Sequence, residues 1–346
     1  MSKFLLIIVL LTYFAVPVSA EPITAPAVPE SGAQFMPEEK ESFGEGLWEM
    51  IQDALMQIQP ELQEAATICF RVIAAAILVG ILHQFPGGSD KIADLAASVA
   101  ISVLLLKDSH SLIHLGTQTI MNLSEYGKLL LPVMTSAVAA QGGLTVSAAL
   151  YTGTALFDTV LCNLISKLLI PMIYLFLAVC VANSAVGEEL LKQISKFIKW
   201  SSVWCLKIIL YVFTGYISIT GVISGTADVA TVKAAKLTIS GMVPVVGGIL
   251  ADASETFLVS AGLIKNAAGL YGIFAILAVF IGPFLQIGCH YLLLRATGAV
   301  CSVFSSKRVA ELIGDFSSAM GLLLAMTGSV CMLLLISTVC FLKGVG

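Results

Sequence analysis

Residues 316–342 read FSSAMGLLLAMTGSVCMLLLISTVCFL and contain no charged side chain. A helix needs about 20 largely apolar residues to cross the hydrocarbon core of a bilayer. Only helices and closed barrels satisfy their own backbone hydrogen bonds there, and this long uninterrupted run favours a helix. The next best candidates are residues 66–82, 92–106, 168–182 with an upstream extension, 200–224 and 270–294, of which the second is short and carries Asp94. The sequence therefore predicts an all-α polytopic integral membrane protein with about six transmembrane helices.

The composition of the whole chain agrees with this class. Of its 346 residues 58% are hydrophobic and 12% are charged, and the mean hydropathy is +0.97, well outside the range of soluble domains. The Lys/Arg stripes and zinc spacings of nucleic-acid binders do not occur. The eight cysteines lie in apolar stretches without a CxxC pair and are interpreted as small buried hydrophobes. We expect no metal and no cofactor.

The amino terminus predicts an export signal followed by an acidic region. Residues 1–20 combine Lys3, an apolar run and small residues before Glu21, which is typical of a secretory signal peptide; an uncleaved anchor helix is the alternative. Residues 21–64 are acidic and end in an amphipathic helix with Leu47, Ile51, Leu55 and Ile58 on one face. We expect this region to be extracytoplasmic and its helix to dock on a partner or on the chain itself. The multispanning membrane domain then covers residues 65–346.

Basic residues in short loops predict the orientation, because such loops are retained on the cytoplasmic side. The loop helices around residues 188–200 and 305–312 are also amphipathic, so we expect both to lie in the membrane interface. With the mature amino terminus outside, six crossings put the carboxyl end outside as well. The basic residues of these turns are Lys91, Lys192, Lys196, Lys199, Lys307 and Arg308.

Two halves of the membrane domain resemble each other. YGKLLLPV at residues 126–133 is echoed by AAKLTISGMVPV at residues 234–245, and Pro171 is echoed by Pro283. Because both basic loops fall on one side, the halves would be parallel repeats, about residues 115–224 and 225–342. Chance similarity of apolar sequence is the alternative.

Two stretches, residues 115–166 and 225–269, are too polar for ordinary spans and too apolar for ordinary loops. Glycine pairs and prolines interrupt both, which predicts two re-entrant or hairpin segments facing a cavity or pore; plain packed hairpins are the alternative. Ionisable groups at membrane depth add functional or packing candidates. The full candidate set is Lys128, Pro132, Gly142, Gly143, Asp158, Lys236, Pro244, Gly247, Gly248, Asp252 and His290.

Other ionisable residues have a simpler interpretation. Arg71, Asp94, Lys167, Lys207 and Arg295 lie near the predicted span ends, where long side chains can reach the interface. No nucleotide loop or hydrolase motif occurs, and the pair His110 and His114 is a weak metal signal. We therefore expect no enzyme. An intramembrane enzyme would require Asp158 to meet His290.

Residues 225–272 read GTADVATVKAAKLTISGMVPVVGGILADASETFLVSAGLIKNAAGLYG. This block resembles the stage III sporulation protein AE family, multispanning membrane proteins of endospore-forming bacteria, and the resemblance extends more loosely over the whole chain. It is carried by Lys233, Lys236, Pro244, Gly248, Asp252, Ala253, Leu263, Lys265 and Asn266. The family offers no catalytic residues to carry over.

The resemblance implies a subunit of a channel or secretion-like complex, made in the mother cell and placed in the membrane around the forespore. Implied partners are other membrane subunits, ring-forming subunits and a separate ATPase, with the mature amino terminus in the intermembrane space. No nucleic acid is implied. A stand-alone permease exporting a small solute or peptide is the alternative.

Overall fold

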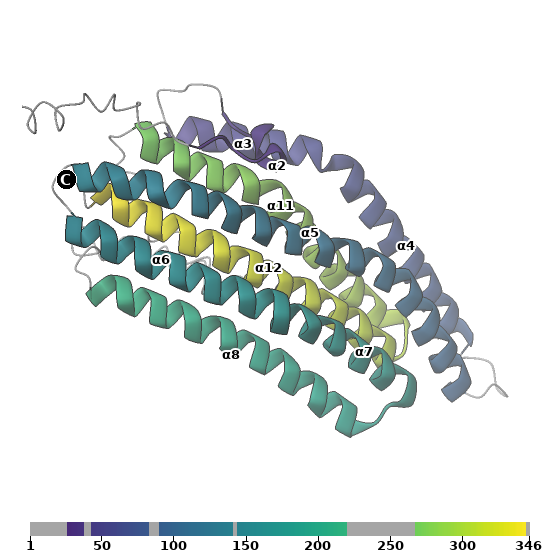
Figure 1. Ribbon diagram of the computed structural model, residues 1–346. Helices are drawn as coiled ribbons and strands as arrows, with labels where there is room; N and C mark the ends of the chain where they lie inside the picture. Colours follow the sequence, from purple (N-terminus) through teal and green to yellow (C-terminus); the bar gives the residue numbers. More distant parts are fainter. Residues whose placement is uncertain (1–25, 38–42, 83–89, 141–143, 220–266, 344–346) are drawn as a thin grey trace, which may run out of the picture.

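The computed structural model describes residues 26–37, 43–82, 90–140, 144–219 and 267–343, and these residues form a helical bundle (Figure 1). Six of the described helices are long and apolar enough to cross a membrane, which confirms the all-α polytopic prediction. The described helices are α2 (Glu30–Ala33), α3 (Phe43–Gln57), α4 (Gln59–Leu82), α5 (Asp90–Ala140), α6 (Leu144–Leu164), the π-helical turn η1 (Ile165–Leu169), α7 (Ile170–Val186), α8 (Glu189–Ile219), α11 (Ala267–Phe304) and α12 (Lys307–Lys343).

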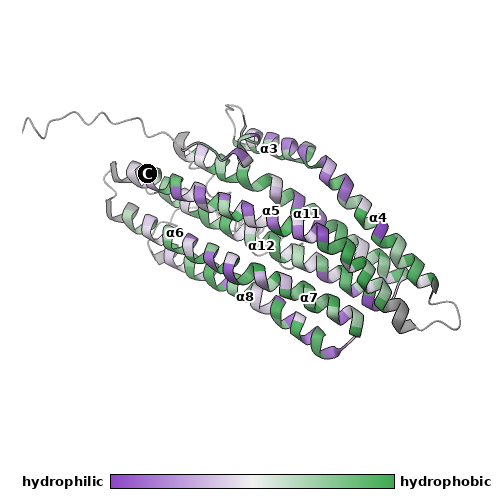
Figure 2. Cartoon of the chain, turned by 45° about the vertical axis from the view of Figure 1, so that its right-hand side comes forward, coloured by the Kyte–Doolittle hydropathy of each residue, from purple (hydrophilic) through white to green (hydrophobic). Residues whose placement is uncertain are grey.

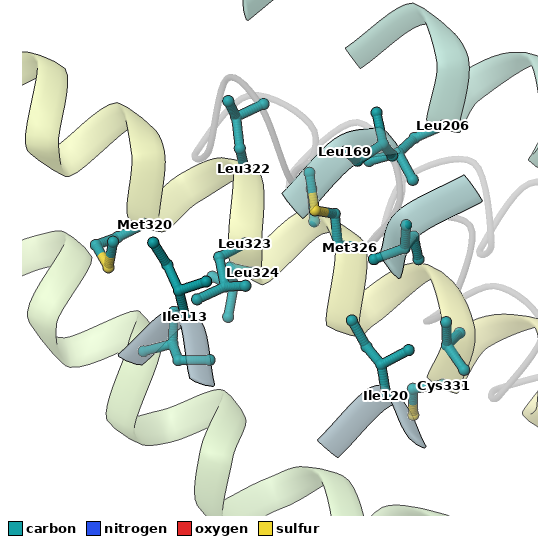
Figure 3. Packing of buried hydrophobic residues seen from close by; sticks show 14 of the residues in the cluster. Ile113, Ile120, Leu169, Leu206, Met320, Leu322, Leu323, Leu324, Met326 and Cys331 are labelled. Atoms are coloured by element: carbon teal, nitrogen blue, oxygen red, sulfur yellow. The ribbon is translucent and has the colours of Figure 1, made fainter. Parts of the chain in front are cut away.

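Helix α12 fills the middle of the bundle. It packs against α5, α6, α7, α8 and α11, and the most apolar part of its spanning stretch is 100% buried. Figure 3 shows how its side chains Leu323 and Met326 lie among Ile113 and Ile120 of α5 and Leu206 of α8. The uncharged run that identifies the last span is therefore shielded by protein on all sides.

Two glycines of α5 allow its close approach to α12. A Cβ atom at Gly116 would lie 2.6 Å from Leu323 Cδ1, and one at Gly127 would lie 2.6 Å from Leu334 Cδ2. Small residues at such crossings let helix backbones pack closely in a membrane. Because Gly116 meets Leu323 and Gly127 meets Leu334, α5 and α12 run in the same direction, and the two contacts define their relative register.

The turn after α7 and the turn after α11 meet at one end of the bundle (Figure 1). Gly187 ends α7 with φ 78°, a left-handed conformation that favours glycine, and Arg308 at the start of α12 packs against it. Ser98, early in α5, hydrogen-bonds Ser184 of α7 with 2.7 Å between the hydroxyl oxygens, and Gly80 of α4 approaches the Phe304 carbonyl of α11. The two described basic turns, after α7 and α11, thus share one end, which agrees with the charge pattern.

Helix α5 corrects the prediction for the first interrupted stretch. The chain runs as one 51-residue helix through Pro132 and returns as α6, so the stretch is a hairpin of two continuous helices and the break predicted at Pro132 is wrong. Neighbouring helices and hydroxyl side chains allow a membrane helix to tolerate proline. The candidate span Leu95–Ser136 is accordingly much longer than the 92–106 predicted, and the next begins at Ala148.

The basic amphipathic stretches also differ from their prediction. They are the first turns of α8 and α12, continuous with the spans, rather than separate interface helices.

The helix expected in the acidic region is α3, and it packs on the chain itself. Met50 and Ala54 are fully buried against Phe274 and Ala278 of α11. Leu55, placed on the apolar face by its spacing, is 47% exposed, so the buried face is rotated toward Met50. The predicted signal peptide, most of the second interrupted stretch and the proposed second repeat up to residue 266 lie outside the described residues.

Candidate functional site

A buried carboxylate joins the two helices of the first hairpin. Asp158 of α6 is 3% exposed, and the Ser124 hydroxyl of α5 donates a hydrogen bond of 2.7 Å to its Oδ2. Cys162, one turn along α6, lies with Sγ 3.7 Å from Oδ1. A buried carboxylate is costly unless it is hydrogen-bonded, so this contact holds α5 and α6 in one register.

A hollow of about 230 Å³ opens beside this pair, between α5 and α6 with η1. Ser124, Glu125 and Lys128 line one side, and Asn163 and Ser166 line the other. Hydrophilic residues mark both helices in Figure 2. A single π-helical turn such as η1, which contains Ser166, often accompanies a functional site because it re-aims side chains. The hollow lies on the outside of the bundle, since α12 occupies its centre.

His290 has a different partner. Its side chain in α11 is almost fully buried, with Nδ1 2.8 Å from the Gln286 carbonyl oxygen and Nε2 3.6 Å from Asp108 Oδ1 of α5. Asp158 and His290 therefore engage separate groups, and the structure does not bring them together as a reactive pair. His110 contacts Tyr174 of α7, with 2.8 Å between Nδ1 and Oη.

The described residues contain no cluster of three or more His, Cys, Asp or Glu side chains that could hold a metal ion. The eight cysteines are free and, within the described helices, buried or half-buried. The cysteines are part of the packed helices, and His110 and His290 contact side chains of neighbouring helices.

A second polar cluster lies at the end where the turns meet. Lys192 of α8 donates to both carboxylate oxygens of Glu311 on α12, at 2.9 and 3.1 Å, and Lys199 donates to the Ser318 hydroxyl at 2.9 Å. Asp315 and Arg308 line an adjoining hollow of about 260 Å³. The sequence identified the basic residues of this cluster but not their acidic partners.

The remaining candidates are placed as follows. Lys128 is exposed at the rim of the first hollow, and Pro132 lies one turn further along α5, also exposed. Lys167 lies in η1, in the middle of the candidate span Ala148–Val186 rather than at the start of a span as predicted. Outside the described residues are Gly142, Gly143, Lys236, Pro244, Gly247, Gly248 and Asp252.

Comparison with known proteins gives one consistent result. The family model described as "Stage III sporulation protein AE" matches residues 33–344. A protein of Bacillus subtilis (strain 168) named "Stage III sporulation protein AE" is 24% identical over 226 residues, which cover 64% of this chain and 56% of the relative. In that match the chain thus spans little more than half the length of its relative. No solved structure matches.

Proposed function

The chain belongs to the stage III sporulation protein AE family, and from this premise we propose that it is a membrane subunit of a channel or secretion-like complex linking mother cell and forespore. Its family has a role in sporulation, and six of the described helices are suited to membrane spans. The proposal assigns it to that complex as a structural and pore-forming component needed for endospore development.

The position of α12 is the observation that carries this proposal. A stand-alone permease needs a route through its own bundle, near its centre. In the described part of the chain the central position is occupied by α12, whose apolar stretch is 100% buried, and the polar hollow beside Asp158 opens outward instead. A conduit that uses this hollow requires further chains, so a subunit of a larger assembly fits better than a permease.

The charge distribution supports a definite orientation within that proposal. The basic turns share one end of the bundle, which by the bias of Lys and Arg faces the cytoplasm of the mother cell. The acidic helix α3 packs on α11, and we place it with the mature amino terminus in the intermembrane space. Other membrane subunits, ring-forming subunits and a separate ATPase are the proposed partners, since we find no nucleotide-binding motif in the sequence.

Assembly is the property that separates the two proposed functions. The gene is deleted in its sporulating host, and a tagged full-length copy is introduced. The copy is used to restore spore formation and to isolate bound proteins from sporulating cells after engulfment of the forespore. We expect loss of spores without the copy, and membrane and soluble partners bound to the tagged chain. A chain that purifies alone and exports solutes from liposomes without partners would support the permease instead.

A further inference from the structure

A third hollow, of about 660 Å³, lies between the end of α11 and the start of α12. Ser305 and Ser306 alone separate the two helices, and both helices are long and apolar enough to span a membrane. A turn this short between two spans lies at a membrane face, so we expect the hollow to open where lipid headgroups meet acyl chains. Its volume falls in the range of about 300–1,000 Å³ that is usual for small-ligand sites.

Small residues leave room for this hollow. Gly298 and Ala299 of α11 line it together with Ala310 and Gly314 of α12. A Cβ atom at Gly314 would have no atom within 4 Å, so the space beside this glycine is open rather than filled by a neighbouring side chain. A molecular group can therefore enter without displacing packed side chains.

Two cationic side chains line the hollow, Arg295 of α11 and Lys307 at the start of α12. Both are exposed, and neither forms an ion pair within the described part of the chain. Glu311 also lines the hollow, but its carboxylate accepts hydrogen bonds of 2.9 and 3.1 Å from Lys192. Among the described residues the lining thus carries two positive charges without a paired carboxylate, which suits an anion.

The neighbouring hollow of about 260 Å³, between α7, α8 and α12, has the opposite balance of charge. Its lining contains more carboxylates than cations, so an anion is favoured in the 660 Å³ hollow and disfavoured in this one. The carboxylates are Glu188, Glu189, Glu311 and Asp315, and the cations are Lys192, Lys307 and Arg308.

An apolar strip of α11 runs beside the cationic hollow. Leu292 is 61% exposed and Val303 is 73% exposed. Leu292, Ala299 and Val303 follow one another at intervals of seven and four residues, so they share one side of the helix, and Ala299 lines the hollow. A phospholipid matches both features, because its anionic phosphate is joined to acyl chains. A soluble phosphate would gain nothing from the apolar strip.

We propose that this hollow binds the headgroup of an anionic phospholipid. Arg295 and Lys307 hold the phosphate, and the acyl chains lie along Leu292. Arg295 precedes Phe304, the last residue of α11, by about 14 Å along the helix, where an unpaired guanidinium facing hydrocarbon is costly. A phosphate drawn into the hollow removes that cost. The inference requires that the chain spans a membrane and does not rest on the proposed role in sporulation.

Counting bound lipid by native mass spectrometry tests the proposal. The purified full-length protein in a neutral detergent is titrated with phosphatidylglycerol and, in parallel, with phosphatidylcholine of the same acyl chains, which has no net charge. We expect the first phosphatidylglycerol to bind at least about tenfold more tightly, because two cations act on its headgroup. Equal affinity for the two lipids would overturn the proposal. Displacement of phosphatidylglycerol by an equal concentration of inorganic phosphate would overturn it too, since the hollow would then take soluble anions.

Charge variants locate the site. Arg295→Gln combined with Lys307→Gln should remove the preference for phosphatidylglycerol, whereas Arg295→Lys combined with Lys307→Arg should keep most of it. The matched control is Lys196→Gln, since Lys196 is an exposed lysine near the start of α8 that does not line the hollow. An equal loss in Lys196→Gln and in the double Gln variant would contradict a defined site, because the whole basic end of the bundle would then attract the lipid.

A steric variant tests the hollow without changing its charge. Gly314→Leu places a side chain in the open space, so we expect it to weaken phosphatidylglycerol binding as strongly as the double Gln variant. Gly215→Leu on α8 is its control, because a Cβ at Gly215 also has no atom within 4 Å and Gly215 does not line the hollow. Binding by Gly314→Leu as tight as that of the parent would show that the lipid sits elsewhere. The charge variants decide the matter if Gly314→Leu does not accumulate.

Discussion

The contact between Gly116 and Leu323 offers a quantitative test of the bundle core. Gly116→Val would place a Cβ atom 2.6 Å from Leu323 Cδ1 and 2.9 Å from Cγ, with two further methyl groups to accommodate. Leu323 is fully buried and cannot swing aside freely. Overpacking of this kind costs about 1–3 kcal/mol of unfolding free energy. We expect a loss near the upper end, because both helices are enclosed by neighbours.

A double-mutant cycle makes the reasoning specific to this contact. Leu323→Ala alone should cost about 2–5 kcal/mol through the cavity that it leaves. In the double variant the valine fills part of that cavity, so the two losses should be less than additive, with a coupling of about 1–3 kcal/mol. Gly215→Val is the matched control, since no atom lies within 4 Å of a Cβ at Gly215.

Unfolding of the purified protein in detergent, followed by the fluorescence of its tryptophans, measures these differences. The control should unfold close to the parent, Gly116→Val clearly earlier, and the double variant later than the sum of the single losses implies. If Gly116→Val is as stable as Gly215→Val, or if the losses at Gly116 and Leu323 simply add, the close packing of α5 on α12 is refuted.

Three further outcomes follow from the described contacts and from the sequence. Ser124→Ala should lower the stability of the detergent-solubilised protein by about 1 kcal/mol, because Asp158 loses its hydrogen bond between α5 and α6. Asp158→Asn keeps an acceptor for the Ser124 hydroxyl and should lower the stability less. A larger loss for Asp158→Asn than for Ser124→Ala would contradict the role of the carboxylate. Lys192→Ala should leave the melting temperature unchanged at physiological salt, since a partly exposed ion pair with Glu311 is screened; a large fall would mean that the turn cluster is shielded from solvent. Pro244→Leu should block spore development while the protein stays at its normal level in the membrane, which immunoblots of membrane fractions and spore counts measure together; full sporulation would remove the functional role predicted for that stretch.

The first interrupted stretch shows where sequence reasoning lost accuracy. Glu125, Lys128 and Pro132 made residues 115–166 look unlike spans, because a single sequence does not reveal which side of a helix is covered. The structure buries Leu123, Tyr126 and Leu130 of the same helix against the core. The first part of the stretch is therefore regular helix within α5, with one side buried and the charged residues on the other.

The sequence also did not predict which side chains on different helices would form pairs. Asp158 stood out as an ionisable group at membrane depth, but its partner Ser124 is on another helix and is an ordinary serine in the sequence. Glu311 likewise carried no signal that it would meet Lys192. Pairings of this kind depend on the relative rotation of packed helices, which local patterns do not encode.

The sequence by itself determined the class of this protein, an all-α polytopic membrane protein with about six apolar spans, and residues 225–272 carried its family resemblance. These properties follow from the cost of placing charge and unpaired backbone in lipid, which acts on each segment separately. Only the tertiary structure decided that α12 occupies the centre, that α5 continues through Pro132, and that Ser124 of α5 meets Asp158 of α6 beside a polar hollow. Those features arise from packing between helices, where close approach at Gly116 and Gly127 defines which side of each helix is enclosed and which remains for water, lipid or another chain.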